Sequence, residues 1–270
     1  MRCARRDPQG RLRLLHAVRP AGELRLNASD QADHADHAEP AGDAGRTDHA
    51  ARIEPPVPPQ QLAALLQSRQ TTLPRRLGDP GPDAAQLAAI VGAAGHAPDH
   101  GRLQPWRFVQ VTDDARGDLA EAFAQALIER EPDASPDALA QASGKAHRGP
   151  VLLLAIVDAG EARMAAAFPL AERLVSCGCA VQNMLLMATA HGFGSSLTSG
   201  QALQSQAVRA LFALRASEQA VCFINMGTVL EAKAARVRPG AQALLTTLHA
   251  KGTAGQGAAF TAPGLLAPRG

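Results

Sequence analysis

The sequence predicts an α+β protein, because segments of helical character and segments of strand character occur in one chain. Residues 151–157 read VLLLAIV, an uninterrupted apolar run that is typical of a strand buried on both faces. Residues 221–227 form a second apolar run of strand length. Residues 170–191 are almost free of charge and apolar all round, which predicts a long helix at the centre of a domain or in a subunit interface.

The composition divides the chain into three parts. Residues 1–57 are mostly rich in Ala, Asp, His, Gly and Pro and lack periodicity, so we expect a disordered leader of low complexity. A proline cluster then marks the expected start of the folded domain, residues 58–240. Residues 241–270 are expected to be a partly disordered C-terminal extension, since their periodicity is weak and their end is rich in Gly, Pro and Ala.

The first predicted helix covers residues 60–69. Leu62, Leu65 and Leu66 share one face, and Arg69 continues it. A buried guanidinium needs an anionic partner. Arg69 therefore either keeps its head in water or acts as a phosphate or carbonyl clamp, and the pattern leaves both interpretations open.

A second helix is predicted over residues 84–94, and a strand follows it. From Trp106 the pattern alternates, with Trp106 and Phe108 on one face and Val109 and Val111 on the other. The short loop between helix and strand is dense in polar side chains, and loops held by rigid elements often bind ligands. Further helices are predicted over residues 115–129, 132–143 and 205–211.

Composition excludes several classes of function. The net charge is +2 and aromatic residues make up 3% with no Tyr, which argues against polyanions and single-stranded nucleic acid as partners. Four cysteines at irregular spacing do not make a disulfide scaffold, so we expect free thiols in a reducing cytoplasm. The uncharged stretch 174–190 is shorter than the roughly 20 apolar residues of a membrane span. No signal peptide is evident, and a cytoplasmic protein without a membrane or nucleic-acid partner is expected.

Several motifs fail on spacing. Gly192-Phe193-Gly194 lacks the third glycine of a dinucleotide-binding turn and follows a helix instead of a strand. His96 and His100 are spaced as zinc ligands can be, but Pro98 lies between them and no glutamate is adjacent, so no metal site is expected. Three separated groups remain that can converge on a flat anionic cofactor: residues 69–71, 96–100 and 194–200. They are compatible with FMN and with many other anionic ligands.

The run 97–108, APDHGRLQPWRF, resembles the signature of the FMN-dependent nitroreductase family, in its short branch of minimal NAD(P)H nitroreductases. The resemblance covers about residues 60–235 and includes Arg69-Gln70-Thr71 where the family usually has Arg-Arg-Ser, the long helix, Gly192-Phe193-Gly194 and Gly227-Thr228. It implies a central mixed, mainly antiparallel sheet flanked by helices. It also implies a homodimer in which both chains build each FMN site at the interface.

The resemblance also implies which residues bind the cofactors. FMN contacts fall on Arg69, Gln70 and Thr71 of one chain, on His96 and His100 of the partner subunit, and on Leu197, Thr198 and Ser199. Contacts to NADH or NADPH fall on Met187, Ala188, Thr189, Ala190, His191 and Gly192. The flavin carries the chemistry in this family, so no side chain is assigned as a catalytic acid or base.

Two departures from the family lower the charge and aromatic area near the flavin. Leu197-Thr198 stands where close relatives carry Trp-Arg, and Gln70 replaces the second arginine; Arg75, Arg76 or Arg102 are candidates to compensate. The resemblance implies an FMN-dependent oxidoreductase that passes electrons from NAD(P)H to a small electrophilic acceptor, nitroaromatic or quinone-like, by ping-pong hydride transfer. The alternatives are a flavin-binding or sequestering protein without useful turnover, and flavin fragmentation or dehalogenation on the same fold.

Overall fold

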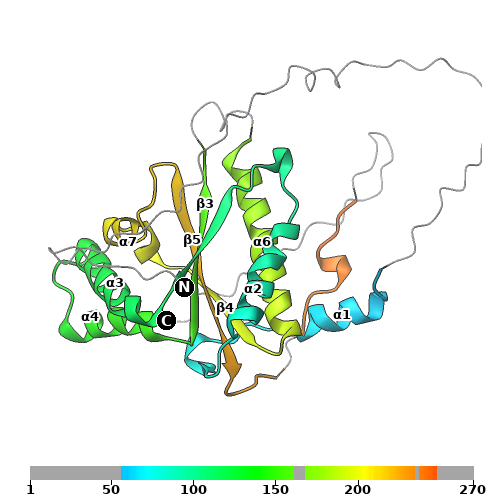
Figure 1. Ribbon diagram of the computed structural model, residues 1–270, viewed down its shortest axis with the longest axis horizontal. Helices are drawn as coiled ribbons and strands as arrows, with labels where there is room; N and C mark the ends of the chain where they lie inside the picture. The colour runs from blue at the N-terminus through cyan, green and yellow to red at the C-terminus, as the bar shows by residue number, and fades with distance from the viewer. Residues whose placement is uncertain (1–55, 161–167, 235–236, 248–270) are drawn as a thin grey trace, which may run out of the picture. The chain divides into compact units, whose positions relative to one another are not determined.

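The computed structural model describes residues 56–160, 168–234 and 237–247, in which helices cover both faces of a central sheet (Figure 1). Nearly all of the expected leader and much of the expected C-terminal extension lie outside the described residues. The strands are β1 (Leu77–Gly78), β2 (Trp106–Val111), β3 (Val151–Asp158), β4 (Gly194–Thr198) and β5 (Glu218–Val229). The α-helices are α1 (Pro59–Ser68), α2 (Ala84–Gly92), α3 (Arg116–Arg130), α4 (Pro136–Ser143), α6 (Leu170–Ala190) and α7 (Gln206–Leu211). The 3₁₀ helices are η1 (Pro74–Arg76), η2 (Ala93–His96), η3 (His100–Arg102), η4 (Asp113–Ala115), η5 (Gly144–His147), η6 (Gln201–Gln204) and η7 (Ala241–Ala243).

Strand β5 is the centre of the sheet. One of its edges pairs with β3, and its other edge pairs with β4 and, further along, with β1. Strand β2 extends the sheet beyond β3, and each of these strand pairs is antiparallel. A single parallel bridge joins Thr71 to Ser195 of β4. The described sheet is therefore mainly antiparallel, as predicted.

Successive residues of β3 enter two separate cores, which explains its uninterrupted apolar run. Leu153 and Ala155 pack with α6 and α2, while Leu152, Leu154 and Ile156 pack with α3 and α7 on the opposite face. Both cores need apolar side chains, so alternation with polar residues is absent. The prediction of a strand buried on both faces is confirmed.

Strand β2 divides its side chains as the sequence pattern predicts. Trp106 and Phe108 belong to the core on the α6 face, and Val109 and Val111 belong to the core on the α3 face. Helix α2 before it begins with a capping box, in which the Asp83 carboxylate accepts a hydrogen bond from the backbone N–H of Gln86 (2.8 Å).

Helix α6 buries one face and exposes the other. Cys177, Val181 and Met184 lie in the core, whereas Leu174 and Val175 remain 40% and 67% exposed. Burial raises the pKa of Cys177 to about 11, so this thiol stays protonated and inert at neutral pH. No helix among the described residues is long and apolar enough to cross a membrane.

The structure adds two strands that the sequence patterns did not predict, β1 and β4. Strand β4 reads GSSLT, which is too short and too polar to show an apolar alternation. Strand β5 is longer than the predicted 221–227, because it continues at both ends to pair with β3 and β1. The exposed helix predicted over 132–143 begins only at Pro136, after its N-cap Ser135.

Candidate functional site

Two of the three predicted ligand-binding groups meet at β4. Residues 69–71 lie alongside this strand, and residues 194–200 contain it. Thr71 forms the parallel bridge with Ser195, and the backbone N–H of Thr72 donates to the Ser195 carbonyl oxygen (2.9 Å). These contacts hold the segment that follows α1 alongside the first half of β4. Leu197 and Thr198 end β4 and Ser199 follows it, so the second group lies at the other end of the same strand.

A pocket of about 230 Å³ opens beside the first half of β4. Gln70, Thr71, Thr189 and Gly192 line it, and all four were predicted as cofactor residues. Gln70 supplies an amide and Thr71 a hydroxyl, which are suitable donors for an anion. The Thr189 hydroxyl already donates to the Leu185 carbonyl oxygen (2.8 Å).

Lys233 also lines this small pocket, and the sequence patterns did not identify it. It is half-buried and has no ion-pair partner among the described residues. Arg76, another lining cation, is already paired with Glu231 (3.1 Å). Lys233 comes after β5 in the chain and belongs to no recognisable motif. It reaches the smaller pocket because β5 runs antiparallel beside β4.

A larger pocket of about 570 Å³ opens at the other end of β4, on the face covered by α3 and α4. Thr198 and Ser199 line its mouth. Its floor is apolar and includes Phe123 and Phe223, whose rings meet edge to face at 5.6 Å. Asn225, 2% exposed, donates from Nδ2 to Thr198 Oγ1 (3.1 Å) and fixes that hydroxyl at the pocket wall.

Polar side chains that were not predicted complete this larger pocket. Gln141, Lys145 and Arg148 line it together with Arg130. Arg130 is paired with Glu131 (2.9 Å), whereas Lys145 and Arg148 have no ion-pair partner within the described part of the chain. An apolar floor with unpaired cations at its edge is suited to a flat ligand that carries negative charge.

Arg69 ends α1 as its C-cap, where its backbone N–H donates to the Leu65 carbonyl oxygen (3.2 Å). Its side chain is half-buried and its guanidinium has no partner in the described ranges. A half-buried side chain fits both interpretations left open by the sequence, and a ligand-binding role for Arg69 stays a prediction.

The third predicted group, at residues 96–100, does not join the other two within one chain. His96 and His100 are exposed and line neither pocket beside β4. His100 Nδ1 lies 3.0 Å from Glu172 Oε2 on α6, and its ring meets Phe168 edge to face at 5.0 Å. Gly101 is required next to it, because a Cβ there would lie 2.7 Å from the Phe168 ring and φ is +72°.

The residues predicted for NADH or NADPH lie at the C-terminal end of α6. Thr189 and Gly192 face the smaller pocket, while Met187, Ala190 and His191 are exposed. The Ala188 side chain is fully buried in the core, so only its backbone faces the neighbouring turn, where its carbonyl accepts from Phe193 N–H (2.9 Å). Within the described ranges no three His, Cys, Asp or Glu residues cluster as metal ligands do.

This geometry defines an α+β protein with pockets at both ends of one strand. A model of the nitroreductase family matches residues 66–228, more than half of the chain. A protein of Haemophilus influenzae named "Putative NAD(P)H nitroreductase" is 32% identical over 169 residues, which cover 62% of this chain and 88% of that protein. The chain belongs to the nitroreductase family.

Solved structures show the same fold. A nitroreductase-like family protein from Bacillus cereus superposes with a TM-score of 0.58 at 17% identity, covering 70% of this chain and 96% of that one. Iodotyrosine deiodinase bound to FMN and 3-iodo-L-tyrosine gives a TM-score of 0.50 at 20% identity, covering 66% of this chain and 95% of the other. At these identities the likeness establishes the fold alone.

Proposed function

We propose that this chain is an FMN-dependent oxidoreductase that passes electrons from NADH or NADPH to a small electrophilic acceptor, nitroaromatic or quinone-like, in a ping-pong scheme. The observation that carries the proposal is that Gln70 and Thr71 line a pocket at one end of β4, and Thr198 and Ser199 line a pocket at its other end. Membership of the nitroreductase family and the FMN named in a structural neighbour support the choice of cofactor.

The donor set beside β4 fits a flavin phosphate. Gln70, Thr71 and Lys233 offer hydrogen bonds and one unpaired positive charge to a phosphate group in the smaller pocket. Lys145 and Gln141 offer donors to a polar ring edge in the larger pocket, whose apolar floor suits an aromatic ring. Lys233 and Lys145 thus replace part of the charge that the departures at Gln70 and Thr198 remove.

When bound, FMN supplies a ring that takes a hydride from the nicotinamide and releases electrons to the acceptor. The chain's residues orient the two substrates and shield the reaction from water. No side chain is proposed as an acid or base. Free thiols at Cys177, Cys179 and Cys222 are in keeping with the cytoplasmic location that we propose.

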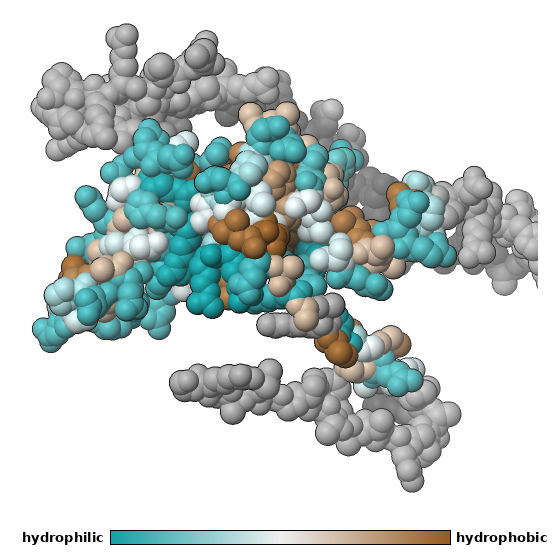
Figure 2. Space-filling model, turned by 90° about the horizontal axis from the view of Figure 1, so that it is seen from below, coloured by the Kyte–Doolittle hydropathy of each residue, from teal (hydrophilic) through white to brown (hydrophobic). Residues whose placement is uncertain are grey.

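We propose a homodimer in which the exposed apolar faces of α1 and α6 are covered by the second copy. Figure 2 shows apolar patches between hydrophilic areas on one face of the protein. Helix α1 has no buried residue, and its Leu62 and Leu66 are each 49% exposed. Leaving such faces in water is unfavourable. A second copy is also needed if His96 and His100 are to reach a flavin bound beside β4.

The first experiment is an absorption spectrum of the purified protein, followed by anaerobic addition of NADPH and then NADH. A flavin band that bleaches supports the proposal, and re-oxidation by a panel of acceptors, with and without oxygen, then identifies the acceptor class. A flavin band that stays oxidised would favour a binding protein. A colourless protein that cannot be reconstituted with FMN would refute the proposed site.

Site variants make the test local. Arg69→Ala and Lys233→Ala are each expected to weaken FMN binding at least tenfold, since each removes one cation beside the smaller pocket. The matched control is Arg238→Ala, which removes an exposed cation that lines neither pocket. Unchanged FMN affinity in both site variants, measured by fluorescence titration, would exclude a phosphate site there.

A further inference from the structure

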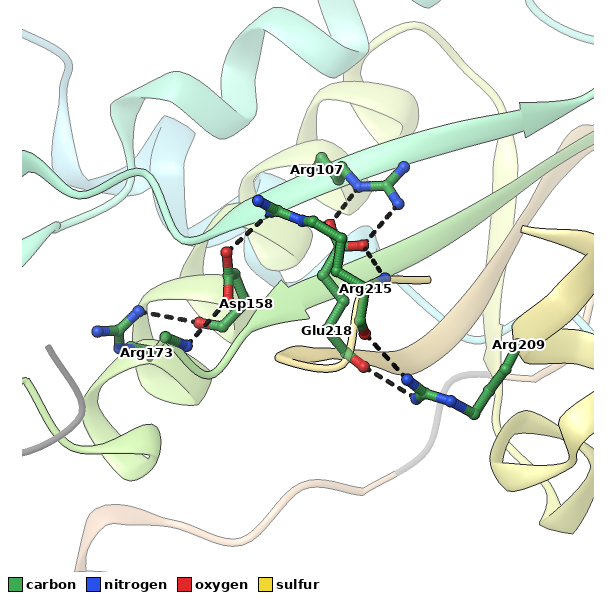
Figure 3. A network of polar contacts seen from close by, with 7 residues as sticks. Arg107, Asp158, Arg173, Arg209, Arg215 and Glu218 are labelled. Atoms are coloured by element: carbon green, nitrogen blue, oxygen red, sulfur yellow. Dashed lines mark hydrogen bonds and ion pairs between the residues drawn. The ribbon is translucent and has the colours of Figure 1, made fainter. Parts of the chain in front are cut away.

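A third pocket, a cavity of about 430 Å³, lies where β3 ends and β5 begins. Asp158 of β3 lies opposite Glu218 of β5 in the strand register at this end of the sheet. Strand β4 lies further along β5, opposite residues 223–227. Figure 3 shows these two carboxylates and the arginines that surround them. No residue that lines this cavity also lines the two pockets beside β4.

A buried carboxylate fixes two guanidinium groups at this cavity. Glu218 is 1% exposed. Its two oxygens accept from Arg107 Nε (2.7 Å) and Nη2 (3.0 Å) in a bidentate arrangement. They also accept from the Arg215 backbone N–H (2.9 Å) and from Arg215 Nη2 (3.1 Å). Both arginines are therefore oriented before any ligand arrives, which lowers the entropic cost of binding.

Arginines make up most of the charged part of the described lining. Arg107, Arg173 and Arg215 line the cavity together with Asp158 and Glu218. Arg173 is 5% exposed and donates from Nη1 to the Asp158 carbonyl oxygen (3.0 Å). The Asp158 carboxylate accepts from Arg215 Nη2 (2.8 Å) and from the Gly160 backbone N–H (2.9 Å).

Two of the arginines keep hydrogen-bonding capacity toward solvent. The side chains of Arg107 and Arg215 are 42% and 66% exposed. Within the described ranges, the Nη1 atoms of Arg107 and Arg215 donate to no acceptor. The network joins β2, β3 and β5, and it leaves these donors at the cavity unused.

Apolar residues form much of the remaining wall. Leu103, Pro105, Trp106 and Ile156 line the cavity. The neighbouring Gln104, which also lines it, has φ +47° and donates its backbone N–H to Asp99 Oδ2 (2.6 Å). The cavity thus combines an apolar wall with oriented cations.

We propose that this cavity binds a small organic anion, with its oxyanion group on the free donors of Arg107 and Arg215 and its apolar body against the wall around Trp106. The shared chemistry is an oxyanion, either carboxylate or phosphate. The proposal does not depend on the proposed flavin chemistry, because the two sites share no lining residue.

Trp106 makes the proposal directly testable, since it is the only tryptophan of the chain and there is no tyrosine. The full-length protein is titrated with benzoate, inorganic phosphate or the neutral benzamide at constant ionic strength, with Trp106 fluorescence as the readout. We expect saturable binding of an anion and none of benzamide. Stronger binding of benzoate than of phosphate identifies a carboxylate with an apolar body, and the reverse identifies a phosphate.

Variants decide whether the arginines are responsible. Arg215→Gln is expected to weaken anion binding at least tenfold, and its exposed side chain makes it the safer variant to fold. The matched control, Arg238→Gln, removes another exposed arginine, which lines none of the three pockets described here. No saturable response to either anion, an equal response to benzamide, or equal weakening by both variants would overturn the proposal.

Discussion

Glu218 is predicted to contribute strongly to stability at neutral pH. The hydrogen bonds from Arg107, followed by those from Arg215, hold the pKa of this carboxyl at about 2, against 4.5 for an ordinary glutamate, although burial opposes the shift. At about 1.4 kcal/mol per pKa unit, this difference corresponds to about 3 kcal/mol. Because the pKa is lower in the folded state, the contribution is complete above pH 4.5 and is lost as the pH falls from 4.5 toward 2.

Glu218→Gln mimics the protonated carboxyl in size, so it separates charge from packing. We expect it to lower the free energy of unfolding by about 3 kcal/mol at pH 7, measured by urea denaturation. The wild type should lose stability between pH 4.5 and 3 more steeply than the variant, because the variant has no carboxyl to protonate at this position. Glu131→Gln is the control, since it breaks an exposed pair with Arg130 and should cost less than about 1 kcal/mol. A loss below about 1 kcal/mol for Glu218→Gln, or parallel pH profiles, would refute the reasoning.

Three further variants test packing and assembly. Val175→Glu places a charge on the exposed face of α6 and should convert the proposed dimer to a monomer, as measured by light scattering. Gly227→Ala should lower the free energy of unfolding by about 1–3 kcal/mol, because its Cβ would lie 2.6 Å from the Pro150 ring and 2.9 Å from the Gly78 carbonyl oxygen. Leu154→Ala should lower it by about 2–5 kcal/mol, because this side chain is fully buried and leaves a cavity.

Each of these variants has a matched control. Ile128→Glu charges an exposed apolar site on α3 and should leave the oligomeric state unchanged; a dimer that survives Val175→Glu contradicts the proposed interface. Gly117→Ala adds a methyl group with nothing within 4 Å, and Leu230→Ala shortens a side chain that is 64% exposed. Losses in the two controls equal to those in Gly227→Ala and Leu154→Ala would show that local packing is not the cause.

The elements that the sequence patterns predict well are those whose environment is uniform. The run 151–157 meets a core on each face, and the alternation from Trp106 to Val111 divides between the same two cores. In both cases burial determines the residue type, as an uninterrupted apolar run in the first case and as an alternation in the second.

The remaining features depend on contacts between distant segments. Strand β4 pairs with β5 and forms a bridge to Thr71, and no local pattern reveals a partner far along the chain. Lys233 and Lys145 are ordinary surface lysines by sequence, and only the fold places them at the two pockets. The arginine cluster around Glu218 likewise joins residues 107, 158 and 218, which no spacing rule connects.

The position of β5 has a consequence for how a nascent chain reaches this structure. During synthesis β2 and β3 can pair as soon as both have been made, but β1 and β4 have their strand partner only in β5, the last described strand to be synthesised. Until then the edge of β3 that pairs with β5 has no strand beside it, because β5 is the only described strand on that edge. Pairings between distant segments form slowly, and unpaired apolar strands promote aggregation. We therefore expect chains arrested before residue 218 to associate with chaperones, and chains released after residue 229 to escape them.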